Sequence, residues 1–316
     1  MHPAKSIVFF TTLSGAGYGL LALLGLFGVL GLLPAGAVPG AITMAICFAL
    51  IFAGLLSSSG HLSHRERAWR AFTQWRSSWL SREAVAALLS FVPAGLFALG
   101  WVLLGEVSGW TRWAGAVAGL CALGTIFTTG MIYGSLKPIA EWHTPFTVPG
   151  YLIYALMSGL TLLTAILSSL GQLPRLLPLI AALLSVAGWL WKKASWRYTA
   201  RAVKLPSANS ATGLGEGTIR SVQWPHSSQN FLLKEMGFRI ARKHSRRLRL
   251  IAQCLGFLGP ALLLLLAQVL GAAAGAVPVV LAALMQLSGL LVERWLFFAE
   301  ATHTISLYYG LGASSS

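Results

Sequence analysis

Long apolar runs separated by short polar segments make up most of the chain. An α-helix needs about 20 mainly apolar residues to cross the roughly 30 Å hydrocarbon core of a bilayer. Eight runs can do so: residues 6–32, 38–58, 84–104, 112–136, 149–170, 174–191, 248–270 and 277–299. They are continuous and rich in Leu and Ala, whereas strands of a membrane barrel alternate apolar and polar residues over about 10 positions. The pattern therefore predicts an all-α fold, an integral membrane bundle of eight transmembrane helices.

The composition agrees with a membrane location. Of the 316 residues, 56% are apolar, and the mean hydropathy is +0.72, whereas soluble domains average about 45–50% apolar residues. We expect a single membrane domain over residues 1–316, with one long basic loop at 192–248. The first run is too long for the apolar core of a signal peptide, so we expect the protein to retain it.

The Lys and Arg residues are divided unequally between the two membrane faces. Eight spans put both termini on one face, which holds 21 of the 23 Lys and Arg residues, against only Arg112 and Arg175 on the other. Cytoplasmic loops carry the excess of positive charge, so we expect both termini to be cytoplasmic. A face this basic attracts anionic lipids and suits an acidic protein partner. Nucleic acid is disfavoured, because these residues line a membrane face and no recognised nucleic-acid-binding fold accompanies them.

The densest polar stretch, residues 58–84, lies between the second and third spans and contains five Arg and three Trp residues. His61 follows the second span and Glu83 begins the third, so a hairpin over 62–82 would bring this base and acid together. Quinone chemistry needs such a pair, since each two-electron step also moves two protons. Histidine titrates near pH ~6.5, and burial raises the pKa of a glutamate towards that range. Two alternatives stay open: helix ends favour both residue types without any function, and the tryptophans suit interfacial anchors.

Several short segments make the chain recognisable. They are His61-Leu62, Arg67-Ala68-Trp69, Ser78-Trp79-Leu80-Ser81-Arg82-Glu83, His2-Pro3-Ala4, Phe10-Thr11-Thr12, Ser14-Gly15-Ala16-Gly17-Tyr18-Gly19 and Glu235-Met236-Gly237-Phe238. With them the chain resembles, from end to end, the membrane anchor subunit of the dimethyl sulfoxide reductase family, and most closely the branch that includes quinone-linked sulfite dehydrogenase anchors. The resemblance puts the quinone-site histidine and glutamate at His61 and Glu83, and we expect Arg67, Arg70 or Trp79 to shape the same pocket.

The resemblance also implies the partners and the cellular location. It implies an iron–sulfur electron-transfer subunit and a molybdopterin catalytic subunit, on a bacterial inner membrane, with menaquinone or ubiquinone as the electron carrier. Chemistry on the sulfur substrate would take place in the catalytic subunit. The cytoplasmic orientation favours sulfite oxidation with quinone reduction. The alternative is a dimethyl sulfoxide reductase that oxidises menaquinol, whose soluble subunits face the periplasm.

Other cofactors find little support in the sequence. Cys47, Cys121 and Cys254 lie inside predicted spans without C-x-x-C spacing, so we expect no iron–sulfur cluster in this chain. Haem b is disfavoured because all seven histidines fall at span ends or in loops. His61-x-x-His64 lacks the further ligands that a zinc site requires.

Two other functions remain as alternatives, a purely structural anchor and a secondary transporter. A transporter would be expected to carry charged residues near the bilayer midplane, whereas the acid–base pair Glu293-Arg294 lies near one end of a predicted span. If His61 and Glu83 do not form the quinone site, the next candidates at the same membrane level are Glu141, His143, Glu300 and His303.

Two local patterns predict structural detail. Gly15-x-x-x-Gly19 in the first span would let another helix approach closely. Apolar residues spaced among basic ones over 230–249 predict an amphipathic helix that leads into the seventh span.

Overall fold

The computed structural model describes residues 5–58, 65–202 and 239–302, together with positions 207, 209, 212, 213, 217 and 219. Its α-helices are α1 (Lys5–Val29), α2 (Ala37–Ser58), α3 (Trp79–Leu104), α4 (Gly109–Gly134), α5 (Thr147–Ser169), α6 (Leu177–Ala202), α9 (Arg239–Gln253), α10 (Gly259–Ala274) and α11 (Ala276–Ala299). A 3-10 helix, η2 (Arg65–Phe72), precedes α3, and a π-helical turn, η3 (Cys254–Leu258), joins α9 to α10. Eight helical segments are long and apolar enough to cross a membrane, and the described ranges contain no strand, which confirms the all-α membrane bundle.

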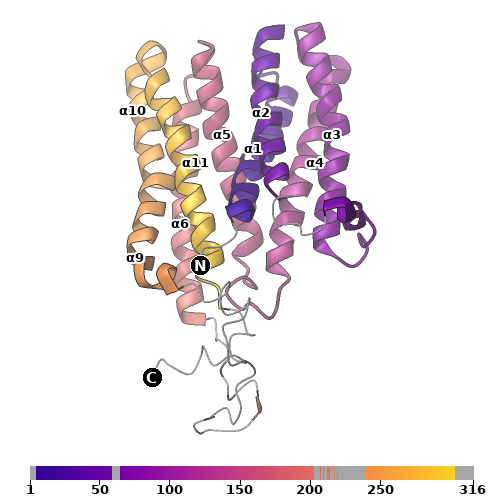
Figure 1. Ribbon diagram of the computed structural model, residues 1–316. Helices are drawn as coiled ribbons and strands as arrows, with labels where there is room; N and C mark the ends of the chain where they lie inside the picture. Colours follow the sequence, from indigo (N-terminus) through magenta and orange to yellow (C-terminus); the bar gives the residue numbers. More distant parts are fainter. Residues whose placement is uncertain are drawn as a thin grey trace.

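The helices form two groups that meet at α1 and α5 (Figure 1). One group consists of α1 to α4, and the other of α5, α6, α11 and the continuous span built from α9, η3 and α10. Helix α1 packs against α2, α4, α5 and α11, and α1 and α5 are the most deeply buried spans. The core of the protein therefore lies along the α1–α5 contact.

A backbone contact at Gly19 brings α1 and α5 together. A Cβ atom on Gly19 would lie 1.8 Å from the carbonyl oxygen of Ala155, so this position has no room for a side chain. A Cβ atom on Gly15 would meet nothing within 4 Å. The expected close approach is therefore confirmed at Gly19, whereas Gly15 faces open space.

Helix α3 begins at Trp79, five residues earlier than the predicted start at residue 84. The hydroxyl oxygen of Ser78 accepts a hydrogen bond from the Ser81 N–H (3.5 Å) and caps the helix. The Arg82 guanidinium donates to the carbonyl oxygens of Trp75 (3.0 Å) and Arg76 (2.7 Å), which fixes the turn that enters the helix. This capped turn is why α3 includes residues that hydropathy alone assigns to the loop.

The long polar segment is shorter than the predicted 192–248 loop at both ends. Helix α6 continues through Lys192 to Ala202, and α9 is helical from Arg239. The expected basic amphipathic helix before the seventh span is confirmed for 239–249, and its first part, 230–238, lies outside the described residues.

One end of the bundle, where α1 begins and α11 ends, is here called the termini face (Figure 1). At this end the Ser57 hydroxyl donates to the carbonyl oxygen of Ser6 (3.1 Å), which holds α2 against α1. The Trp142 indole donates to the carbonyl oxygen of Phe297 (2.9 Å), which ties the α4–α5 connection to α11. The first bond lies within the α1–α4 group, and the second joins the α4–α5 connection to the other group at this level.

Candidate functional site

Glu83 is a buried acid near the termini face. It lies in the second turn of α3, and only 5% of its surface is exposed. The Thr129 hydroxyl of α4 donates a hydrogen bond to Glu83 Oε1. Within the described residues, Oε2 of the same carboxyl group has no hydrogen-bond or ion-pair partner. Because α3 begins at Trp79, Glu83 lies beyond the first turn, and helix polarity does not explain an acid here.

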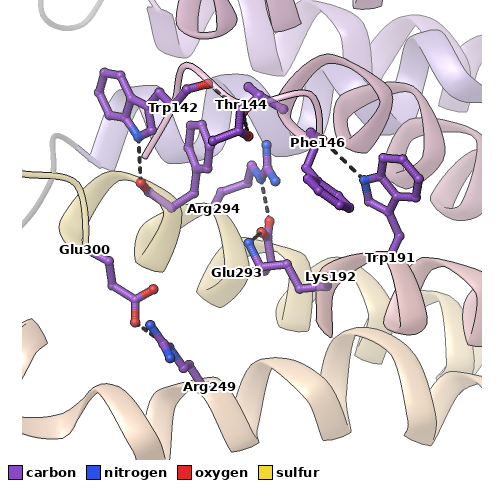
Figure 2. Close-up of polar contacts among 11 residues, drawn as sticks. Trp142, Thr144, Phe146, Trp191, Lys192, Arg249, Glu293, Arg294 and Glu300 are labelled. Atoms are coloured by element: carbon purple, nitrogen blue, oxygen red, sulfur yellow. Dashed lines mark hydrogen bonds and ion pairs between the residues drawn. The ribbon is translucent and has the colours of Figure 1, made fainter. Parts of the chain in front are cut away.

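A second buried charged group lies at the same level, where α6 meets α11. Figure 2 shows Lys192 and Arg294 meeting at the carboxylate of Glu293. The Arg294 Nε atom lies 2.5 Å from Glu293 Oε2, and Lys192 Nζ contacts Oε1. The three side chains are all buried and carry a net charge of +1. We call them the buried ion triad.

Three aromatic rings surround the guanidinium group of Arg294. Its guanidinium carbon lies 4.4 Å from the ring centroid of Tyr151, 4.9 Å from that of Phe297 and 5.3 Å from that of Tyr154. Ring faces attract a cation, and more strongly where water is excluded. These contacts offset part of the cost of burying the uncompensated charge of the triad.

A pocket of about 500 Å³ lies over the buried ion triad, and we call it the termini-face pocket. Glu141 and Glu300 form part of its rim, where Glu141 Oε1 accepts from the Thr302 N–H (3.0 Å) and Arg249 Nε lies 2.7 Å from Glu300 Oε1 (Figure 2). Its aromatic lining consists of Trp142, Phe146, Tyr151, Tyr154, Trp196 and Phe297. Charged side chains and aromatic rings therefore line the same pocket.

Sequence comparison identifies the chain. Residues 1–311 match the family described as DMSO reductase anchor subunit (DmsC). The chain belongs to this anchor family. It is also 34% identical over 337 residues to one of the subunits of the sulfite dehydrogenase of Allochromatium vinosum, covering 98% of this chain and 99% of that protein. No solved structure matches the chain.

Membership of the anchor family confirms the resemblance that the short motifs indicated. The protein is a multi-pass membrane anchor, and its partners are other subunits of an oxidoreductase complex. The three cysteines are free and lie on α2, α4 and η3. Of the histidines, the structure describes His143, whose Nδ1 lies 2.7 Å from the carbonyl oxygen of Gly134, and His244.

The residues expected to form the anchor family's quinone site are only partly brought together. His61 lies outside the described residues. Trp79 lies one turn before Glu83, with its ring edge-on to Phe127 at 6.0 Å. Arg67 and Arg70 are exposed on η2, and no hydrogen bond or ion pair joins either of them to Glu83.

Lys192 and Thr129 belong to this anchor's polar interior, which the sequence does not predict. Hydropathy places Lys192 in the loop, where further basic residues follow it. One indication of a buried cation is Glu293, because an acid inside an apolar run needs a buried partner. For Thr129, the sequence shows only that it lies in the segment Phe127-Thr128-Thr129, which does not indicate a contact with Glu83.

Proposed function

We propose that this protein is the quinone-reactive membrane anchor of a molybdopterin oxidoreductase complex. It passes electrons between an iron–sulfur subunit and the quinone pool. The observation that carries this proposal is Glu83, a carboxyl group buried inside a membrane-spanning helix. Ionisable side chains are costly within the membrane, and those that occur there mark binding sites and proton pathways.

Glu83 suits the proton chemistry of this half-reaction. Reduction of one quinone takes two electrons and two protons and yields one quinol. The electrons come from the iron–sulfur subunit, and the protons reach the ring oxygens through hydrogen-bonded titratable groups. Thr129 fixes Oε1 of Glu83, and Oε2 is left to bond a ring oxygen. His61 is proposed as the second proton-transfer group at the same site.

Two observations support a direction for the reaction: the expected orientation of the protein in the membrane and its similarity to a sulfite dehydrogenase subunit. By the sequence, 21 of the 23 Lys and Arg residues are expected on the face that bears both termini, which favours a cytoplasmic location. The relative is named a sulfite dehydrogenase subunit. We therefore propose that the partner subunits oxidise sulfite in the cytoplasm and that this chain reduces quinone. An active alkaline phosphatase fused after Ser316 would contradict this orientation and favour a dimethyl sulfoxide reductase that oxidises menaquinol.

Substitution of the proposed proton-transfer groups tests the quinone site. His61→Ala and Glu83→Gln should leave the complex assembled and its soluble subunits active with an artificial electron carrier. Quinone-linked turnover should fall by about 10²-fold or more, the usual effect of losing such a group. Glu106→Gln is the matched control, because Glu106 is exposed beyond the other end of α3. Assembled His61→Ala and Glu83→Gln complexes with wild-type quinone turnover would refute the site.

A further inference from the structure

A small cavity of about 30 Å³ lies inside the protein where α1, α4, α5 and α11 meet. Most of its polar lining consists of hydroxyl groups, with the guanidinium of Arg294 at one side. The hydroxyl groups belong to Thr11, Thr12, Ser14, Tyr18, Thr129, Tyr151, Tyr154 and Ser158. Such a concentration of hydroxyls is unexpected for a void between membrane-spanning helices.

Water fits this cavity in size, and hydroxyl groups on its otherwise mainly apolar wall provide hydrogen-bond partners. A polar cavity of roughly 10–15 Å³ holds one water molecule if it offers two to four polar partners. The hydroxyl oxygens of Thr12 and Tyr151 are buried, and neither has a hydrogen-bond partner in the described part of the chain. An unsatisfied buried hydroxyl costs about 1–3 kcal/mol. Bound water would remove this cost at both groups.

The cavity lies between Glu83 and the termini-face pocket. Glu83 lines neither space, but Thr129 lines the cavity and also donates to Glu83 Oε1. Tyr151, Tyr154 and Arg294 line both the cavity and the termini-face pocket. A chain of polar groups therefore runs from the pocket past Arg294 and Tyr151, through the cavity, to Thr129 and Glu83.

We propose that water held by Thr12, Tyr151 and Thr129 carries protons between the termini-face pocket and Glu83. This inference rests on the proposed function, in which Glu83 exchanges protons with the quinone. For each quinone reduced, two protons enter from water at the termini face, and the two electrons come from the iron–sulfur subunit. The Thr129 hydroxyl takes part by accepting a hydrogen bond from cavity water while it donates to Glu83.

Gly15 offers a position from which a side chain can fill the cavity. It lines the cavity, and a Cβ atom there meets nothing within 4 Å. Gly15→Val should displace the water. Gly124→Val is the matched control, since Gly124 also has no atom within 4 Å of an added Cβ but is exposed on α4, away from the cavity. Thr12→Val removes one hydroxyl at nearly constant volume, and Thr12→Ser restores it.

The assembled complex is assayed for quinone-linked turnover, quinone affinity, activity with an artificial carrier and the solvent deuterium isotope effect on turnover. Gly15→Val and Thr12→Val should lower quinone-linked turnover by roughly 10-fold to 100-fold. This decrease is no larger than the one expected for Glu83→Gln. The isotope effect should rise, because proton delivery becomes rate-limiting. Quinone affinity and artificial-carrier activity should match those of Gly124→Val, and Thr12→Ser should recover most of the turnover.

The outcomes separate this proposal from the proposed function. Loss of turnover in Glu83→Gln, together with wild-type turnover and isotope effect in Gly15→Val and Thr12→Val, overturns the water route alone. Full turnover in Glu83→Gln overturns the role of Glu83 in the proposed function, and the water route with it. If Gly15→Val does not assemble, the comparison of Thr12→Val with Thr12→Ser decides, since a dry cavity makes these two variants equal in turnover.

Discussion

Thr129 donates a hydrogen bond to the carboxyl group of Glu83 across the interface between α3 and α4, and both side chains are buried. A carboxyl group in an apolar interior needs such a partner, because burial without one is costly. The same hydroxyl lines the internal cavity, so it contacts both the acid and the space that leads to the termini face.

Replacing Thr129 should weaken the quinone reaction through the position of Glu83. Thr129→Val removes the donor at nearly constant volume, and we expect quinone-linked turnover to fall by about 10-fold, equivalent to about 1.4 kcal/mol. Thr129→Ser keeps the hydroxyl and should recover most of the rate. Artificial-carrier activity, measured on the same membranes, should be unchanged in both variants. Equal quinone-linked rates for the Val and Ser variants would contradict this role.

The buried ion triad should contribute strongly to stability. Lys192→Met leaves a neutral Glu293–Arg294 pair but removes the partner of Glu293 Oε1, and an unsatisfied buried acceptor costs about 1–3 kcal/mol. We expect a lower thermal unfolding transition of the purified chain in detergent and a lower yield in the membrane. Lys193→Met is the control, because Lys193 lies over the Trp189 ring (4.5 Å), a contact worth about 0.5–1 kcal/mol when exposed. Equal transitions for the two variants would show that the triad is not stabilising.

Gly19 and Gly15 should differ in their tolerance of a methyl group. Gly19→Ala places a Cβ atom against the backbone of α5 at Ala155, so α1 and α5 must separate. Gly15→Ala meets no atom within 4 Å. We expect Gly19→Ala to reduce the amount of folded chain in the membrane, measured by detergent gel filtration, and Gly15→Ala to leave it near the wild-type amount. Similar losses in both variants would mean that the α1–α5 contact is not as close as described.

Exposed arginines at the termini face should bind the iron–sulfur subunit. Reversing Arg67, Arg70, Arg246 and Arg247 to Glu repels an acidic partner, and charged surfaces control the rate and strength of such association. Washed membranes should lose the soluble subunits, and the loss should increase at higher salt. Arg175→Glu, an exposed position at the opposite end, is the control. Full retention of the subunits would mean that these charges serve only lipid binding and orientation.

The spans, the fold class and the family can all be read from the amino-acid sequence. A span is a local property, since the bilayer requires about 20 apolar residues in a row whatever the rest of the chain does. The sequence also predicts Glu83 as a site residue, because a charged residue at the edge of an apolar run is conspicuous and lies in a motif typical of the family. Helix starts were less accurate, as at Trp79, because capping by Ser78 extends a helix beyond its apolar part.

Which polar groups lie together depends on how the helices pack. Thr129 is 46 positions from Glu83, and Lys192 reaches Glu293 only because α6 packs beside the α10–α11 pair. Hydropathy assigned Lys192 to the loop, because a lone lysine is too costly inside a membrane. Its pairing with a carboxylate from another helix removes much of that cost, so α6 continues past it. The cavity likewise exists because residues of α1, including Gly15, lie at the same level as residues of α4, α5 and α11. No pattern within one helix predicts this arrangement.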